Sequence, residues 1–190
     1  VLVGTNITFG STVTTTNLGP VTITNSGLLD LSSGLGITCN GPFTQSGTGT
    51  ISIAGEIFAE DQPVSIASDM TLVGNTDIDS GIVGEDITIS GNVNGAFEFE
   101  VCPVAGDLLI TSAIGETVRV TTFEIDRTTN ASVQKVYAGN IVQIDGTGTT
   151  TFNEDETFTL GTLTHLNWPV YSPAATGAAI AVRCRACPGL

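Results

Sequence analysis

The sequence predicts an all-β protein. Apolar and polar residues alternate with a period of two along much of the chain, and no window of a dozen residues shows a sustained i, i+3, i+4 apolar pattern with caps. Short phrases such as Ile51-Ser52-Ile53-Ala54-Gly55 and Ile87-Thr88-Ile89-Ser90-Gly91 recur. Gly, Asn, Asp and Ser separate these phrases, and such residues tolerate the backbone conformations of tight corners. We therefore expect short strands joined by corners.

The repeated phrases predict the strands of the first half. Neighbouring phrases start 11 to 16 residues apart, at Ile7, Val21, Ile37, Ile51, Val64, Thr76 and Ile87. A drifting period of this kind is typical of stacked β-structure. We interpret residues 1–95 as a repetitive β-solenoid-like unit, in which inward Ile, Val, Leu and Phe form a buried column and Thr and Ser point outward.

After Gly95 the predicted strands become longer, and every basic residue lies beyond Val118. The longer strands are expected at 116–126, 132–137, 157–164 and 178–185. This change predicts a second, β-sandwich-like unit over residues 96–190, with residues 128–131 as the turn between two antiparallel strands. The main alternative is a single β-sandwich or jelly roll across the whole chain, because short alternating strands do not by themselves determine topology.

The charge balance excludes some partners. The chain has 19 acidic and 5 basic residues and a net charge of −14, which repels nucleic acid and anionic lipid headgroups.

No apolar stretch approaches the roughly 20 residues that a membrane-spanning helix needs, so no membrane insertion is expected. The chain opens at Val1 and its one methionine is Met70, which favours a mature extracellular or cell-surface protein from which a signal segment has been removed.

Four cysteines, Cys39, Cys102, Cys184 and Cys187, are candidates for structural disulfides and allow three fully paired connectivities. Strand residues three apart point to opposite faces, so Cys184 and Cys187 are expected to find separate partners. A redox pair and half of a zinc site are the alternatives for this C-x-x-C, and free thiols are a further alternative for the cysteines. The sequons that begin at Asn6 and Asn130 are candidate N-glycosylation sites.

An acidic phrase, residues 75–81 with Asp86 following, loosely resembles a calcium-binding loop. Its alternation equally suits a strand with acids on the solvent face, and we prefer that interpretation. Asp77, Asp79 and Asp86 are also candidates for the acid–base pair of a glycan-cleaving enzyme. His165, the one histidine, has no Gly-x-Ser-x-Gly element to serve. We predict no catalytic, metal or cofactor site and no enzymatic activity.

The repeats of the first half resemble the passenger regions of bacterial surface adhesins and filamentous-haemagglutinin-like proteins, in which phrases such as Ile87-Thr88-Ile89-Ser90-Gly91-Asn92-Val93 recur. The resemblance covers residues 1–95 and concerns the texture of the repeats. It implies an exported surface protein and carries over no functional residue.

The N-terminal segment is a candidate for self-assembly. Val1 to Phe9 is strand-forming and has no charged side chain, and such an edge favours pairing with another chain. The predicted assembly strand comprises Val1, Leu2, Val3, Ile7 and Phe9, and it would add to the next subunit. The alternative is that this segment folds back as an ordinary first strand.

Together these features predict a non-enzymatic extracellular structural protein, the homopolymer-forming subunit of a surface filament, fibre or coat. One alternative is an adhesin or tail-fibre module that binds a host surface glycan or receptor. The other is a glycan-cleaving β-helix enzyme.

Overall fold

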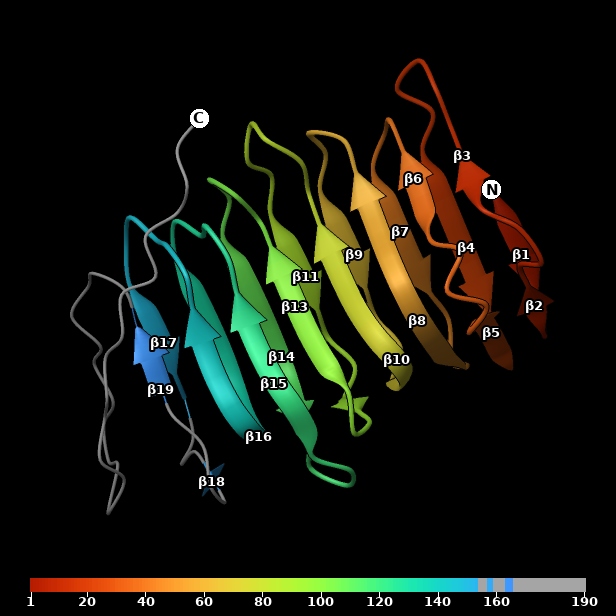
Figure 1. Cartoon of the computed structure of the whole chain (residues 1–190). Coiled ribbons are helices and arrows are strands. Elements are labelled where there is room, and N and C mark those ends of the chain that lie inside the picture. Colours follow the sequence, from red (N-terminus) through yellow and green to blue (C-terminus); the bar gives the residue numbers. More distant parts are fainter. Residues whose placement is uncertain (154–156, 159–162, 166–190) are drawn as a thin grey trace.

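The chain folds as a parallel β-solenoid. The computed structural model describes residues 1–153, 157–158 and 163–165, the last two ranges as backbone only. These residues hold 19 strands and no helix, and each strand pairing recorded among them is parallel. The strands lie side by side along one axis, in chain order from the red N-terminal end to the blue end (Figure 1).

The strands form three ladders, here called A, B and C. Ladder A comprises β1 (Leu2–Gly4), β4 (Val21–Asn25), β7 (Phe43–Ser46), β9 (Val64–Ile66), β11 (Ile87–Ile89), the starts of β14 (Leu108–Ile114) and β16 (Ala131–Gln143), and β17 (Thr150–Phe152). Ladder B comprises β2 (Ile7–Thr8), β5 (Leu28–Leu31), the starts of β8 (Thr50–Ala59) and β10 (Met70–Asp79), β12 (Val93–Asn94), the end of β14, the middle of β16 and β18 (Thr157–Phe158). Ladder C comprises β3 (Val13–Thr14), β6 (Ile37–Cys39), the ends of β8 and β10, β13 (Glu98–Cys102), β15 (Val120–Ile125), the end of β16 and β19 (Leu163–His165).

One full turn takes about 22 residues and one strand from each of the three ladders, which is longer than the 11 to 16 residues between the phrases recognised in the sequence. Thr24 lies opposite Ser46, 22 residues further along the chain. Each phrase supplies one strand of one ladder, so the spacing between phrases drifts with the length of the corners. The β-solenoid predicted for the first half is confirmed, and its repeating unit is the three-strand turn.

The core is a column of inward side chains that runs the length of the solenoid. Alternation along each strand sends every second residue inward, and these residues are almost completely buried. Phe99 and Phe123 stack in successive turns, with ring centroids 5.9 Å apart and an interplanar angle of 17°. Contact between like residues in successive turns is the main stabilising interaction in such a fold.

One stretch of this column is polar. Gln45 is buried, and its amide nitrogen donates to Asn25 Oδ1 at 2.7 Å and to Ser68 Oγ at 2.8 Å. Its amide oxygen accepts from the backbone N–H groups of Ala67 and Ser68. Three successive turns are therefore joined through one satisfied buried amide, as burial of a polar group requires.

The sandwich predicted for residues 96–190 is not found in the described part of that range. Val101 of β13 lies between Ile78 and Ile125 in the same parallel ladder. β15 and β16 also pair in parallel, so residues 128–131 do not form an antiparallel turn. The strands became longer because the chain passes corners without leaving strand conformation, and β16 alone contributes to all three ladders. The strand expected at 178–185 lies outside the described residues.

The first turn folds back on its own chain. Leu2 lies opposite Ile23, Ile7 opposite Leu29, and Val13 opposite Ile37. The alternative of an ordinary first strand therefore describes the structure of β1 to β3. The outward edge of this turn pairs with no described strand, and Ile7, Phe9 and Val13 are only partly buried against the core.

Candidate functional site

The most distinctive polar feature of the described residues is a row of acids on ladder C. Glu56, Asp77, Glu100 and Glu124 occupy equivalent outward positions on β8, β10, β13 and β15. Neighbouring strands of a sheet are about 4.8 Å apart, so these side chains rise from closely spaced backbone positions. We call this row the acidic ladder.

A groove runs beside the acidic ladder. Its volume is about 440 Å³, and Glu56, Asp77, Glu98 and Glu100 line it together with Asn75. Asn75 Oδ1 accepts from the backbone N–H of Glu98 at 3.2 Å, which joins β10 to β13 at the groove. The groove thus has carboxyl groups from three successive turns.

Asp77 is the most perturbed acid of the groove. Burial, followed by the charges of Glu100, Asp79, Glu56 and Asp126, raises its pKa to about 7. One of its carboxyl oxygens, Oδ1, is buried and has no hydrogen-bond partner among the described residues. Both desolvation and like charges favour the neutral form, so this carboxyl holds a proton much more readily than an exposed aspartate.

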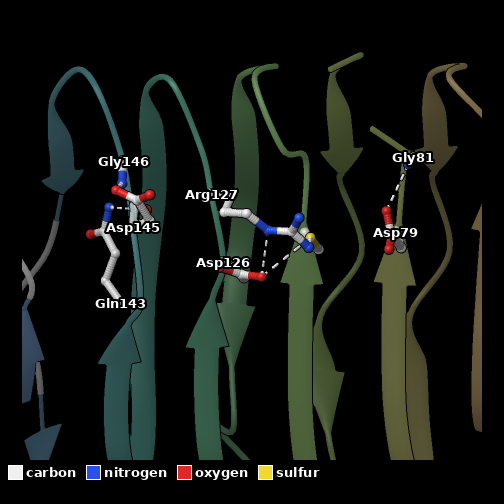
Figure 2. A network of polar contacts seen from close by, with 8 residues as sticks. Asp79, Gly81, Asp126, Arg127, Gln143, Asp145 and Gly146 are labelled. Carbon is white, nitrogen blue, oxygen red and sulfur yellow. Dashed lines mark hydrogen bonds and ion pairs between the residues drawn. The ribbon is translucent and has the colours of Figure 1, made fainter. Parts of the chain in front are cut away.

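Glu100 and Asp79 are shifted in the same direction. Burial is the main cause of the raised pKa of each, and the charge of Asp126 adds to it. The backbone N–H of Gly81 donates to Asp79 Oδ1 at 2.6 Å and opposes the rise for Asp79. Figure 2 shows this contact at the end of β10.

Arg127 is the cation that the structure places beside these acids. Its Nε lies 2.8 Å from Asp126 Oδ2 (Figure 2). Its Nη2 donates to Cys102 Sγ at 3.2 Å. The Arg127 charge lowers the pKa of both Asp79 and Glu100. Arg127 offsets only part of the rise in these two pKa values, because burial and the neighbouring acids raise them by more than its charge lowers them.

The structure separates the three aspartates that the sequence grouped together. Asp77 and Asp79 are both on β10, where residues 75–79 are strand, so the interpretation as an acidic strand is confirmed. Asp86 lies in the corner before β11, where its Oδ1 accepts from the backbone N–H of Asp107 at 2.9 Å. It lines a different groove. Glu56, Glu98, Glu100 and Asp126 were not singled out from the sequence, although Glu56, Asp77 and Glu100 are each about one turn apart.

The described cysteines are free thiols. Cys39 and Cys102 are both buried and free, so neither forms a disulfide with another residue that the structure describes. Burial raises the pKa of the Cys39 thiol and raises that of Cys102 to about 12. Cys39 lies among the core residues, where a thiol behaves as a small apolar group. Cys102 lies opposite Asp79 in ladder C and is buried beside Asp126 and Arg127. Cys184 and Cys187 lie outside the described residues.

The sequons differ in their surroundings. Asn6 is exposed, and its Oδ1 accepts from the backbone N–H of Leu28 at 2.9 Å. Asn130 belongs to a corner ladder: its Nδ2 donates to Asp107 Oδ1 at 2.9 Å, and its Oδ1 accepts from the backbone N–H of Thr149 at 3.0 Å. A glycan on Asn130 would be attached to a nitrogen that already joins two turns.

The described residues contain neither a metal centre nor a membrane-spanning helix. Among the residues the structure describes, no group of three or more His, Cys, Asp and Glu is arranged to hold a metal ion. The same residues include no helix long and apolar enough to span a bilayer. His165 ends β19, where its backbone lies opposite Gln143.

Comparison with protein-family models gave no match, and neither did comparisons with curated proteins and with solved structures.

Proposed function

We propose that this protein is a non-enzymatic structural subunit of an extracellular filament, fibre or coat, which assembles through the open edge of its first turn. The single observation that carries the proposal is the state of that edge. The side chains of Val1 and Val3 are 90% and 77% exposed, and the strands β1 to β3 pair on one side only among the described residues.

The composition of the first turn supports edge pairing. No charged side chain occurs before Asp30, and natural sheets commonly protect their edges with charges, prolines or bulges. Half-buried Ile7, Phe9 and Val13 would gain full burial from one more turn of β-structure, as Leu29 and Ile37 have in the next turn. We assign this role to a second copy of the chain, which agrees with the resemblance to repetitive surface proteins.

This proposal changes one detail of the expected assembly. Because β1 and β2 already pair with β4 and β5 of their own chain, the N-terminal segment acts as an edge and is not donated into a neighbour. In a filament the edge of the first turn pairs head to tail with a different strand edge of the next copy through backbone hydrogen bonds, because two first-turn edges joined to each other would close a dimer.

A charge placed on the edge tests the proposal. Val3→Lys puts an ammonium group on the unpaired edge, where a strand of the second copy would pair. It should abolish filaments in negative-stain electron micrographs, and the molar mass from light scattering should fall to that of the monomer. Val73→Lys is the matched control, since Val73 is an exposed valine on β10 away from the edge. Filaments that persist in Val3→Lys, or wild-type protein that stays monomeric when concentrated, would overturn the proposal.

The acidic ladder supports a second candidate function, cleavage of a glycan. An aspartic acid with a pKa near 7 is suited to general acid catalysis, and Glu100 on the adjacent turn would act as the charged partner. Retaining glycosidases hold two carboxyl groups about 5 Å apart, close to the spacing of adjacent strands. Release of reducing ends from acidic and neutral polysaccharides, lost in both Asp77→Asn and Glu100→Gln, would establish this activity; no release by wild-type protein would exclude it for those substrates.

A further inference from the structure

Ladder A presents a surface of a different kind from the acidic ladder. On β4, β7, β9 and β11 the outward residues form two columns that run along the solenoid. The first column is Thr22, Thr44, Ser65 and Thr88, which are in register from turn to turn. The second column lies two residues further along the chain and consists of Thr24 and Ser46 on β4 and β7, followed by Ala67 and Ser90 directly after β9 and β11. We call these two columns the hydroxyl face.

The hydroxyl face is regular in both directions. Successive turns are about 4.8 Å apart, and outward residues two positions apart on a strand are separated by about 6.7 Å. The pairings that join β4, β7, β9 and β11 show no shift of register. Thr24 Oγ1 and Ser46 Oγ lie 3.0 Å apart, so the hydroxyls of adjacent turns are within hydrogen-bond distance of each other.

The side chains of this face are also held in place. Threonine is β-branched and has a restricted χ1 angle, and in the first column each residue stands between in-register neighbours. Binding would therefore order few additional rotamers. Seven of the eight positions present a hydroxyl group, the threonines add a methyl group, and Ala67 presents a methyl group alone. The face lies directly over the buried core, and such preorganisation lowers the cost of binding.

The chemistry of the face restricts its ligand. None of its eight outward residues is charged, although the whole chain has a net charge of −14. An anionic polymer would require cations, and a sugar ring would be expected to stack on an aromatic side chain, which the hydroxyl face lacks. What the face offers is a flat, repeating set of hydroxyl and methyl groups. Its two repeats lie close to oxygen–oxygen repeats on the surface of hexagonal ice.

We propose that the hydroxyl face binds ice. Hydroxyl groups in register hydrogen-bond to lattice water, and the methyl groups occupy the spaces between those waters. A single hydrogen bond to water contributes little net free energy, because the exposed hydroxyl is already hydrated. The protein therefore stays on the ice crystal only if the whole array of hydroxyl and methyl groups matches the lattice. Bound protein then arrests the growth of that ice surface.

The hydroxyl face ends where the pattern changes. On β14 the first column continues with Leu109, which is 42% exposed, and a hollow of about 450 Å³ lies beside it. This interruption confines the site to β4, β7, β9 and β11. The acidic ladder belongs to ladder C and is a different face, whereas the open edge of the first turn adjoins the hydroxyl face, because β1 pairs with β4 and Val3 lies opposite Thr24.

Thermal hysteresis and inhibition of ice recrystallisation test the proposal with the full chain. Wild-type protein should show both effects, and Thr44→Lys should abolish them because the long cationic side chain holds the lattice away from the face. Thr88→Lys repeats the test on another turn in case one variant folds poorly. Thr71→Lys is the matched control: Thr71 is an exposed outward threonine of β10 on ladder B, and its substitution should leave both effects unchanged.

Three results would overturn the proposal. The first is wild-type protein that matches a serum albumin blank in both assays. The second is an equal loss of activity in Thr71→Lys and Thr44→Lys when circular dichroism shows both to be folded. The third is a change of oligomeric state in Thr44→Lys with no change in ice growth, which would make the face a contact between copies. Filament formation is measured separately, so the proposed assembly can fail without affecting this result.

Discussion

Asp77 on β10 lies directly opposite Glu100 on β13, in register within the parallel ladder. Two acids in this position place like charges on adjacent turns, and the solenoid gains no cross-strand attraction at that point. A stacked fold repeats any such mismatch along its axis. The acidic ladder therefore lowers the stability of the fold, and a local loss of stability of this kind is common at functional sites.

Asp77→Asn should stabilise the protein in a pH-dependent way. The folded pKa, about 7, is above the ordinary value of 3.8, so the folded state binds more protons than the unfolded state between these values. The free energy of unfolding therefore falls as the pH rises from about 4 to 7, and the whole cost is present above pH 7. After allowance for solvent screening, the gain in Asp77→Asn should be about 1–2 kcal/mol at pH 8 and close to zero at pH 3.

Urea unfolding of wild type and Asp77→Asn at pH 3, 5 and 8 measures this difference. Glu116→Gln, which removes an exposed carboxyl elsewhere, is the control and should change the free energy of unfolding little at each pH. An Asp77→Asn variant that is less stable than wild type at pH 8 would contradict the account of the acidic ladder.

Gln45→Ala should be strongly destabilising. The substitution leaves Asn25 Oδ1 and the backbone N–H of Ser68 without their partner in a buried site, and Ser68 Oγ keeps only its contact with Gly47 O at 3.4 Å. Each unsatisfied group costs about 1–3 kcal/mol, and partial relaxation would leave a total loss of about 3 kcal/mol. Gln62→Ala, at a partly exposed corner, is the comparison and should cost less than about 0.5 kcal/mol. Equal melting temperatures for the two variants would show that the buried amide network contributes little.

Strand positions were predictable from the sequence, whereas pairing was not. Alternation marks inward residues such as Ile51 and Ile53 because burial selects apolar side chains at every second position. Which strands are neighbours depends on turn length, and corners of unequal length hid the repeat of about 22 residues. The sandwich was predicted because a strand that crosses a corner, as β16 does, has the same alternation as a long antiparallel strand.

The acidic ladder could be predicted only in part for the same reason. Asp77 and Asp79 are recognisable as outward acids of one strand, since they alternate with Ile78. Their partner Glu100 becomes a neighbour through the register of β10 and β13. Its shifted pKa also depends on Asp126, which is buried at the end of the next strand.

Gly49→Ala should disrupt the corner between β7 and β8. A Cβ atom on Gly49 would overlap the backbone carbonyl group of Gly27 and the side-chain nitrogen Nδ2 of Asn25 in the preceding turn. Backbone atoms cannot move away without breaking the hydrogen bond from Gly49 N–H to Asn25 O. We expect a loss of about 1–3 kcal/mol in thermal or urea unfolding. Gly10→Ala, where a Cβ meets no atom within 4 Å, should be neutral, and a loss as large at Gly10 would contradict the packing argument.

Arg127→Ala should destabilise the protein, because it removes the cation that lies beside Asp126, Asp79 and Glu100. The Asp126 side chain is 13% exposed, and its Oδ2 forms the 2.8 Å ion pair with Arg127 while Oδ1 is buried without a partner. Removal of one partner of a largely buried pair typically costs about 3–5 kcal/mol, and the 47% exposure of the Arg127 side chain places the expected loss near or below about 3 kcal/mol at pH 7. The loss should shrink towards pH 4, because Asp79 and Glu100 have raised pKa values and their protonation removes part of the negative charge that Arg127 neutralises. The double variant Arg127→Ala/Asp126→Asn should recover most of the stability at pH 7, and the coupling energy follows from urea unfolding of the four proteins in the cycle. Additive losses in that cycle, or a loss in Arg127→Ala that is the same at pH 4 and pH 7, would show that the arginine stabilises the corner through packing alone.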